Sequence, residues 1–418
     1  MDLKSRLAQL DRLTRKTSAR VSDKPVIRSL DQKEALSSLG LLAVETEHGC
    51  VWVKEHTDPI APVLNGFPNM KGLFTRGPDL CPLPDDLVLM DTETTGLSGG
   101  TGTLVFQLGL SWWQGDRLIT RQYFLPGPAN EAAMLADVAD RVRKFSTVVT
   151  FNGASFDLPL LRTRSLLNRV VDPFANLVSW DLLVPARRLW KNCLPNCRQG
   201  TVEKWVCGIQ RGAGDIDGSL IPQTWFDFLA TGSPGELNNV LTHNHRDMVG
   251  MARILGVLGQ VGWWLNEGPG LNEDLPELGG WYDRAGWWAM GKTFERRNDS
   301  PAAAQCFRRA WRGGWGQLLG DDARVRFRRD ALRNLKRGGH WDLVAEIIAD
   351  GLNDGTDLLR LHREAAILYE HRLVDWGRAL VHAEACGEEH RQSRLLMRIE
   401  KANAFNETRS EDGSAKCR

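Results

Sequence analysis

The sequence predicts an α/β domain with a mixed sheet flanked by helices, followed by an all-α helical domain. Between residues 87 and 151, three apolar strands of a meander precede a helix and a further strand. This order is typical of a mixed sheet with helices on its faces. Beyond residue 280 the apolar side chains recur only at helical spacing. With 418 residues, 42% of them hydrophobic, the chain has enough apolar surface for about two or three globular domains.

The composition excludes several classes of protein. The 53 basic and 52 acidic residues give a net charge of +1, which argues against a histone-like phosphate binder. No apolar run reaches the ~18 residues that a membrane span needs, and no apolar segment typical of a secretory signal follows the basic N-terminus. The eight cysteines show no paired framework. We therefore expect a cytoplasmic protein with no membrane partner.

Residues 1–84 are predicted to form an N-terminal extension with little regular structure. Leucines from Leu3 to Leu13 recur at helical spacing, which suggests a short amphipathic helix. Val51–Val53 is a candidate strand. Prolines at positions 59, 62 and 68 favour an extended chain, so the first domain is expected to begin at about residue 85.

Residues 85–265 are predicted to form the α/β domain. Its first strand, Leu87–Met90, is apolar at every position, as expected of a strand buried on both faces. Leu177–Leu183 is either a fifth strand or the start of a helix that ends near Trp190. The other expected elements are strands over 103–113, 117–125 and 147–151, and helices over 131–145, from about 153 to 168, and over 235–264.

A Gly-, Pro- and acid-rich linker is predicted over 266–280, followed by helical repeats over 281–403 and a disordered tail over 404–418. The segment from Trp287 to Phe307 follows the tetratricopeptide pattern W-x2-L-G-x2-Y…A-x3-F. Ala345 and Ala379 lie one repeat length of 34 residues apart. The alternative is a generic helical bundle. In both cases we expect a separate helical domain that supplies no metal ligands.

Two carboxylates directly follow the first apolar strand. Asp91 and Glu93 are two residues apart, so on a strand they point to the same side. Adjacent carboxylates repel each other and lose hydration when buried, and a divalent cation removes both costs. Oxygen ligands of this kind suit Mg²⁺ and Mn²⁺. The alternative is a strand end whose acids face solvent.

Two further acidic motifs follow along the chain. Asn152 closes a second apolar strand, and Asp157 falls in the first turn of the helix after it. His243 and Asp247 are four residues apart on a later helix and therefore share one face. Taken singly, Asp157 could be an ordinary acid at a helix N-terminus, and His243 with Asp247 could be part of a polar helix surface.

Together, in this order, the three motifs resemble those of the DEDD 3′–5′ exonucleases of the ribonuclease-H-like (DnaQ-like) fold. Asp91 and Glu93 match the family's first motif, Asn152 and Asp157 the second, and Asp247 the last acid. The sequence is most similar to the YprB-like branch, whose members carry a His-Asn pair, here residues 243–244, and some of which end in tetratricopeptide-like repeats. A run over 181–190 is also similar to that branch.

The resemblance implies hydrolysis of a phosphodiester bond with two Mg²⁺ or Mn²⁺ ions. His243 would accept the proton of the attacking water. The implied metal ligands are Asp91, Glu93, Asp157 and Asp247. The implied contacts to single-stranded DNA or RNA are Thr94, Thr95, Gly96, Leu97 and Asn152.

A second hypothesis from a different class is a nucleic-acid- or protein-binding scaffold with a catalytically weak nuclease fold. In both hypotheses the helical repeats are a possible site for a protein partner. Cys193, Cys197 and Cys207 lack the spacing of a zinc site. The four acids in the family's order favour the enzyme, because a scaffold needs no converging carboxylates.

Overall fold

The computed structural model describes residues 29–62, 83–96, 102–191, 194–212, 216–266, 281–313 and 320–414. The expected helix at Leu3–Leu13, Leu97, Cys193 and residues 267–280 of the expected linker lie outside these ranges. The chain divides into two compact units. The first comprises Met1–Pro62, Pro84–Trp180 and Gly212–Met251, and the second comprises Val63–Leu83, Asp181–Arg211 and Ala252–Arg418.

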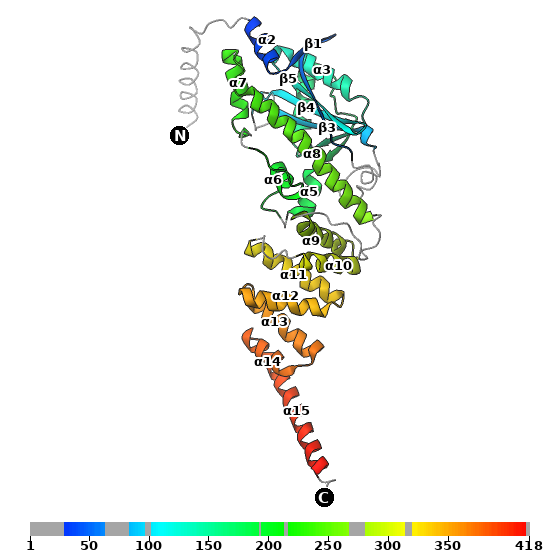
Figure 1. Ribbon diagram of the computed structural model, residues 1–418, viewed down its shortest axis with the longest axis vertical. Coiled ribbons are helices and arrows are strands. Elements are labelled where there is room, and N and C mark those ends of the chain that lie inside the picture. The colour runs from blue at the N-terminus through cyan, green and yellow to red at the C-terminus, as the bar shows by residue number, and fades with distance from the viewer. Residues whose placement is uncertain are drawn as a thin grey trace, which may run out of the picture. The chain divides into compact units, whose positions relative to one another are not determined.

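A seven-stranded mixed sheet forms the centre of the first unit (Figure 1). The spatial order of its strands is β1-β2-β5-β4-β3-β6-β7. Neighbours from β1 to β3 pair antiparallel, whereas β3 pairs with β6 in parallel. The strands are β1 Leu42–Thr46, β2 Gly49–Asp58, β3 Leu87–Thr94, β4 Val105–Gln114, β5 Arg117–Phe124, β6 Thr147–Thr150 and β7 Val178–Asp181. The predicted mixed sheet is confirmed.

The hairpin β1–β2 corrects the expectation for the N-terminal part of the chain. The sequence places these residues in an extension, with a strand only at Val51–Val53. Instead β2 runs to Asp58 and pairs with β5 along Trp52–Asp58, which adds two strands to the sheet. The apolar signal is weak because Lys54, Glu55 and His56 occupy the second half of β2.

The two faces of the sheet are covered by different helices. On β5, Gln122 donates from Nε2 to the backbone O of Leu241, 2.8 Å away, in helix α8 (Leu237–Asn266). Its neighbour Tyr123 points the other way and donates to Asp137 of α3 (Glu131–Val142) over 2.7 Å. Since neighbouring side chains on a strand alternate, α8 lies over one face and α3 over the opposite one.

Buried polar and aromatic contacts fix the remaining elements of the first unit. Helix α4 (Asp157–Asn168) is joined to α3 by Arg164, whose Nε donates to the buried Glu131 over 2.6 Å. Helix α7 (Ile221–Thr231) places Trp225 against Phe106, with ring centroids 5.6 Å apart. The sequence did not predict α7, and α2 (Ser29–Ser38) lies in the expected extension.

The second unit is all-helical within its described residues after β7 ends. It begins with α5 (Leu183–Trp190) and α6 (Gln199–Val206), both of which pack on α9. Each later helix packs on the next. They are α9 Trp281–Arg296, α10 Ser300–Arg312, α11 Asp321–Arg337, α12 Trp341–Asp354, α13 Leu358–Leu368, α14 Trp376–Ala385 and α15 Glu389–Ser414, with a π-helical turn over Tyr369–Leu373.

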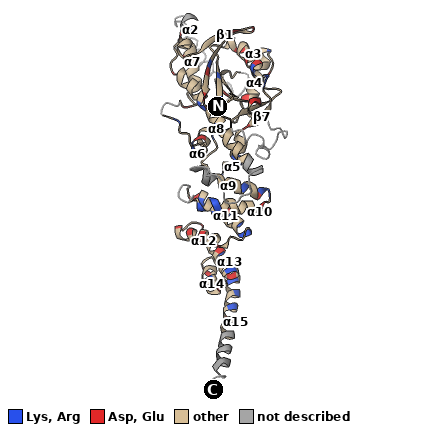
Figure 2. Cartoon of the chain, turned by 45° about the vertical axis from the view of Figure 1, so that its right-hand side comes forward, with Lys and Arg blue, Asp and Glu red and all other residues tan. Residues whose placement is uncertain are grey.

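Close packing explains the small residues of this unit. A Cβ on Gly291 of α9 would lie 2.9 Å from the ring of Phe307 on α10, so only glycine fits where these helices cross. Charges also complement one another between α11 and α12 (Figure 2), where Arg328 binds Asp350 over 2.5 Å.

Two features of the C-terminal part bear on the predicted domain limits. Residues 181–211 group by their contacts with the later helices. Helix α15 continues to Ser414, into the segment predicted to be disordered. Among the described helices, none combines the length and apolar character needed to cross a membrane.

Candidate functional site

Strand β3 presents two carboxylates to the face covered by α8. Asp91 lies opposite Gly109 of β4, and Glu93 lies opposite Gln107. The register then shifts between Glu93 and Thr94, so the regular ladder ends where the second carboxylate leaves the sheet. The fully buried run before Asp91 anchors both acids at the end of a rigid strand.

Helix α8 brings two consecutive polar residues and one further acid to this strand end. Nε2 of His243 lies 3.3 Å from Oδ2 of Asp247. Single ligand atoms of Glu93, His243 and Asp247 all lie within 4.8 Å of one another. Asn244, fully buried, donates from Nδ2 to Oδ2 of Asp91 over 3.0 Å. Asp247 therefore lies on the same side of the sheet as Asp91.

Asp91 is held in an unfavourable environment for a charge. Burial raises the pKa of its carboxyl group well above the usual value, and Asp247, Glu93 and Asp157 raise it further. The hydrogen bond from Asn244 acts in the opposite direction and is the weaker influence. All four carboxylates that the sequence singled out are thus close enough to interact, and a cation between them would relieve the repulsion.

Asp157 reaches the site from the turn between β6 and α4. The hydroxyl of Thr92 donates to Oδ1 of Asp157. Asn152 adopts a left-handed φ of 71°, which asparagine tolerates better than most residues. A Cβ on Gly153 would lie 2.6 Å from Cβ of Thr150 and 3.0 Å from Oδ2 of Asp157. The Asn-Gly pair therefore lets the chain turn tightly enough to bring Asp157 to β3.

The residues expected to hold a terminal nucleotide shape the loop after β3. Thr94 donates from Oγ1 to the backbone O of Gly96 over 3.0 Å. The backbone N of Leu104 donates to Oγ1 of Thr95 over 2.9 Å. These hydroxyls stabilise the loop where it leaves the sheet, and Leu97 lies outside the described residues.

Several residues around the site were not found from the sequence. Gly109 and Gln122 lie in one row across the sheet with Asp91, and Thr92 binds Asp157. Gln107, opposite Glu93, is fully buried, and neither atom of its amide has a hydrogen-bond partner among the described residues. Cross-strand neighbours follow from the register of pairing, for which the sequence carries no local motif.

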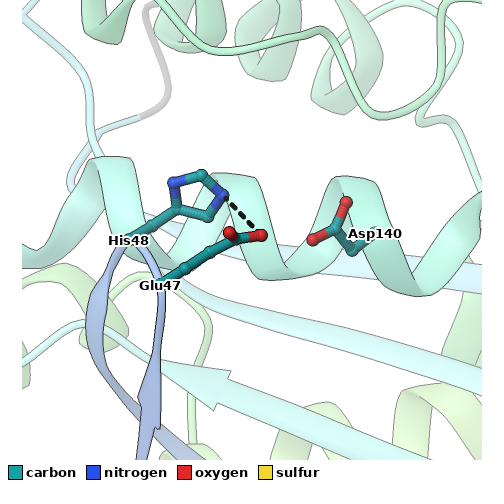
Figure 3. A group of neighbouring side chains, drawn as sticks. All are labelled: Glu47, His48 and Asp140. Atoms are coloured by element: carbon teal, nitrogen blue, oxygen red, sulfur yellow. Dashed lines mark ion pairs between the residues drawn. The ribbon is translucent and has the colours of Figure 1, made fainter.

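A second group of metal-binding residue types lies on the surface of the first unit. It consists of Glu47 and His48, in the turn between β1 and β2, and Asp140 of α3 (Figure 3). Nε2 of His48 lies 3.7 Å from Oε1 of Glu47. All three residues are exposed, so their charges are already hydrated and screened. Exposed groups of this kind are common without a metal, and we assign this one no function.

The donors at the end of β3 fit a divalent cation. The donors are carboxylate oxygens, which suit a hard ion such as Mg²⁺ or Mn²⁺, and His243 lies beside them. The raised pKa of Asp91, caused first by burial and then by its acidic neighbours, has the same implication, because a bound cation favours the charged form of a buried carboxylate.

Comparison with known proteins agrees with this geometry. Residues 88–258 match the RNase_H superfamily. Over 171 residues the chain is 39% identical to the uncharacterized protein YprB of Bacillus subtilis (strain 168), a match that covers 41% of this chain and 41% of that protein. The matched region therefore spans less than half of that relative's length.

A solved structure of the family B DNA polymerase from the hyperthermophilic archaeon Pyrobaculum calidifontis also matches. The match covers 69% of this chain and 36% of the polymerase chain, with a TM-score of 0.33 and 12% sequence identity. This similarity is too low to support an inference. The superfamily match and the mixed sheet flanked by helices are consistent with a ribonuclease-H-like fold over residues 88–258.

Proposed function

We propose that the ribonuclease-H-like domain at residues 88–258 is a metal-dependent nuclease that hydrolyses phosphodiester bonds of single-stranded DNA or RNA. One observation carries the proposal. Four carboxylates from three separate elements interact at the end of β3, and the electrostatic cost appears as the raised pKa of Asp91. A purely structural domain gains nothing from this arrangement, whereas a cation site requires it.

The ligands in this proposal are Asp91, Glu93, Asp157 and Asp247. Asp91 is central, because its carboxyl group interacts with all three of the others. Two divalent ions ~3.5–4 Å apart would lower the pKa of a water molecule and stabilise the charge on the leaving oxygen. Thr92 would orient Asp157 through its hydroxyl, and Asn244 would do the same for Asp91.

His243 is proposed as the general base. Its Nε2 lies within the group formed with Glu93 and Asp247, so the ring can take up a proton at the place where the acids converge. Asp247 would then stabilise the protonated imidazole from 3.3 Å. The contact between His243 and Asp247 supports this role. The two residues are four positions apart, so both side chains lie on one face of α8.

The finer assignments follow from the resemblance to the YprB-like exonucleases. We propose 3′–5′ exonuclease action of the DEDD type, with Asn152 and residues 94–97 contacting the terminal nucleotide. The helices from α9 onward are proposed to form tetratricopeptide-like repeats that bind a protein partner. Gly291 against Phe307 supports this, because the tetratricopeptide pattern places a glycine and a large residue at these positions.

Single-stranded DNA and RNA oligonucleotides, labelled at the 5′ end, test the proposal. With Mn²⁺, we expect the full-length chain to shorten the labelled strands stepwise from the 3′ end, and we expect a chelator to stop this cleavage. Asp91→Asn should remove at least 99% of the activity, on the order of the ~3 kcal/mol that one essential charge-stabilising group contributes. The exposed Asp140→Asn is the matched control and should retain full activity. Cleavage by Asp91→Asn at the wild-type rate would count against this site, whereas a wild-type chain that cleaves neither substrate with Mn²⁺ would favour the scaffold hypothesis.

A further inference from the structure

A chain of buried amides leads away from Asp91 across the sheet. Nδ2 of Asn244 donates to Oδ2 of Asp91 over 3.0 Å, and Oδ1 of Asn244 accepts from Nε2 of Gln122 over 2.9 Å. Oε1 of Gln122 lies 3.1 Å from Nε2 of His56 on β2. Gln122 and Asn244 are both completely buried. Hydrogen bonds through two fully buried side chains, Asn244 and Gln122, therefore connect Asp91 to β2.

The direction of this chain is fixed by one backbone carbonyl. The O atom of Leu241 lies 2.8 Å from the Gln122 amide and can only accept, so the Gln122 atom facing it must be the nitrogen. The same nitrogen donates to Asn244, which turns the oxygen of Asn244 toward Gln122 and its nitrogen toward Asp91. The remaining Gln122 oxygen accepts from His56. Every donor in the chain thus points toward Asp91.

A glycine makes room for this arrangement. Gly109 lies between Asp91 and Gln122 in the register of the sheet. A Cβ at this position would lie 2.6 Å from Oδ1 of Asn244, closer than a real contact allows, and 3.1 Å from Sδ of Met248. The missing side chain lets α8 approach the sheet so closely that Asn244 lies above Gly109 and reaches both neighbours.

The outer end of the chain is also held. The ring of His56 stacks on His245, with centroids 4.0 Å apart and planes 14° from parallel. Nε2 of His245 in turn lies 2.8 Å from Oδ2 of Asp58. The consecutive residues 243, 244 and 245 therefore have three different contacts: with Asp247, with Asp91 and with Asp58.

We infer that Asn244 and Gln122 are positioning residues that fix the orientation of the Asp91 carboxylate for cation binding. Asn244 occupies Oδ2 of Asp91 with a donor and so directs the other oxygen toward the cation. Gln122 acts through Asn244, because it prevents the Asn244 amide from turning its oxygen toward Asp91. This inference rests on the proposed metal site. Outer hydrogen-bond partners of metal ligands typically contribute about 10- to 100-fold to metal affinity.

Two uncharged variants of similar shape test it in the full-length chain. Asn244→Leu removes the hydrogen-bond donor to Asp91. Gln122→Met leaves Asn244 in place but removes the amide that donates to Oδ1 of Asn244 and so orients it. Asn238→Leu is the matched control, because Asn238 is exposed on the same helix. The probe is Mn²⁺ alone, titrated by calorimetry without nucleic acid, and urea unfolding in the presence of a chelator reports the stability of each variant.

We expect both variants to bind Mn²⁺ about 10- to 100-fold more weakly than the wild type, and Asn238→Leu to bind it unchanged. On oligonucleotides, the Mn²⁺ concentration that gives the half-maximal rate should rise by a similar factor. A general loss of stability instead lowers the rate at every Mn²⁺ concentration, because it reduces the amount of folded enzyme. If Asn244→Leu fails to fold, Gln122→Met decides alone. Wild-type affinity in a folded Gln122→Met variant overturns the inference but not the proposed function. A wild-type chain that binds no Mn²⁺ overturns the proposed function itself.

Discussion

In the metal-free protein, the position of Asp91 favours a rigid carboxylate but disfavours its negative charge. Its position at the end of a buried strand gives a rigid ligand, yet burial and three neighbouring carboxylates disfavour its charge. A folded-state pKa above the unfolded value means that the native state binds a proton that the unfolded state has lost. The stability of the metal-free protein should therefore fall as pH rises from the unfolded pKa of about 3.9 toward the raised pKa of the folded state.

Asp91→Asn should remove this pH dependence. The substitution keeps the shape of the side chain but deletes the buried charge, so the metal-free variant should be more stable than the wild type at neutral pH. Urea unfolding with a chelator, measured between pH 5 and pH 8, checks this. Asp140→Asn serves as the control, since Asp140 is exposed. A wild type that becomes more stable with rising pH, with Asp91→Asn following it in parallel, would contradict the account of Asp91.

The acids of the site were predictable at the scale of single residues, but their supports were not. Asp91 and Glu93 follow an apolar strand, and Asp157 follows a strand-to-helix turn, so local sequence is enough to find them. Gln122 lies far from Asp91 in the sequence and is brought to it by the pairing of three strands. Register depends on the whole sheet, and no short motif predicts it.

At the scale of elements, the apolar patterns predicted the central strands and the helices after them. The strands β3 to β6 and the helices α3, α4 and α8 begin and end within a few residues of the predicted limits. The elements that were missed have mixed surfaces. In α7, Ile221, Trp225 and Phe228 recur at helical spacing, but this stripe covers one side of a short helix whose N-cap, Leu220, has no side chain that could cap it.

A buried charge joins α15 to the π-helical turn before α14. Glu370 is completely buried at its side chain and binds Arg391 over 2.5 Å and Arg394 over 2.9 Å. Burial acts to raise the pKa of Glu370, but the arginines outweigh it and the pKa is lowered. The stabilisation is therefore present above the unfolded pKa of about 4.3 and is lost as pH falls below it.

Glu370→Gln should separate α15 from the helices it packs on. The variant removes the charge that Arg391, Arg394 and Arg398 share, although Arg391 keeps its ion pair with Glu388, so we expect a loss of about 1–3 kcal/mol. Urea unfolding followed by far-UV circular dichroism measures the loss, and Glu384→Gln, an exposed acid on α14, is the control. Equal midpoints for Glu370→Gln and the control would show that the ion pairs contribute little.

At the scale of the whole molecule, the division into two units changes where the chain can be cut. The linker predicted over 266–280 would allow the chain to be cut at its end, after Gly280. Helices α5 and α6 pack on α9, however, and α5 buries Trp190 almost completely. A chain that ends at Gly280 would lose α9 and expose the apolar surface of α5 and α6.

We expect the chain that ends at Gly280 to be less stable than full length, with increased binding of a hydrophobic dye. A chain that ends at Ser414 keeps α9 to α15, including the ion pairs of Arg328 with Asp350 and Asp354, and should keep both stability and cleavage of short oligonucleotides. Urea unfolding measures the stability of each shortened chain against full length, and dye fluorescence measures its exposed apolar surface. A fully stable chain ending at Gly280 would show that α5 and α6 do not depend on α9.

The central claim is that the four carboxylates at the end of β3 bind divalent cations. Crystals of the full-length chain soaked with Mn²⁺ and a nucleoside 5′-monophosphate, the product of exonuclease action, test it most directly through anomalous scattering from manganese. The account predicts anomalous peaks bonded to Asp91, Glu93 and Asp247, with a second ion about 3.5–4 Å from the first. A map without manganese at Asp91, or with manganese only at the exposed group of Glu47, His48 and Asp140, would contradict it.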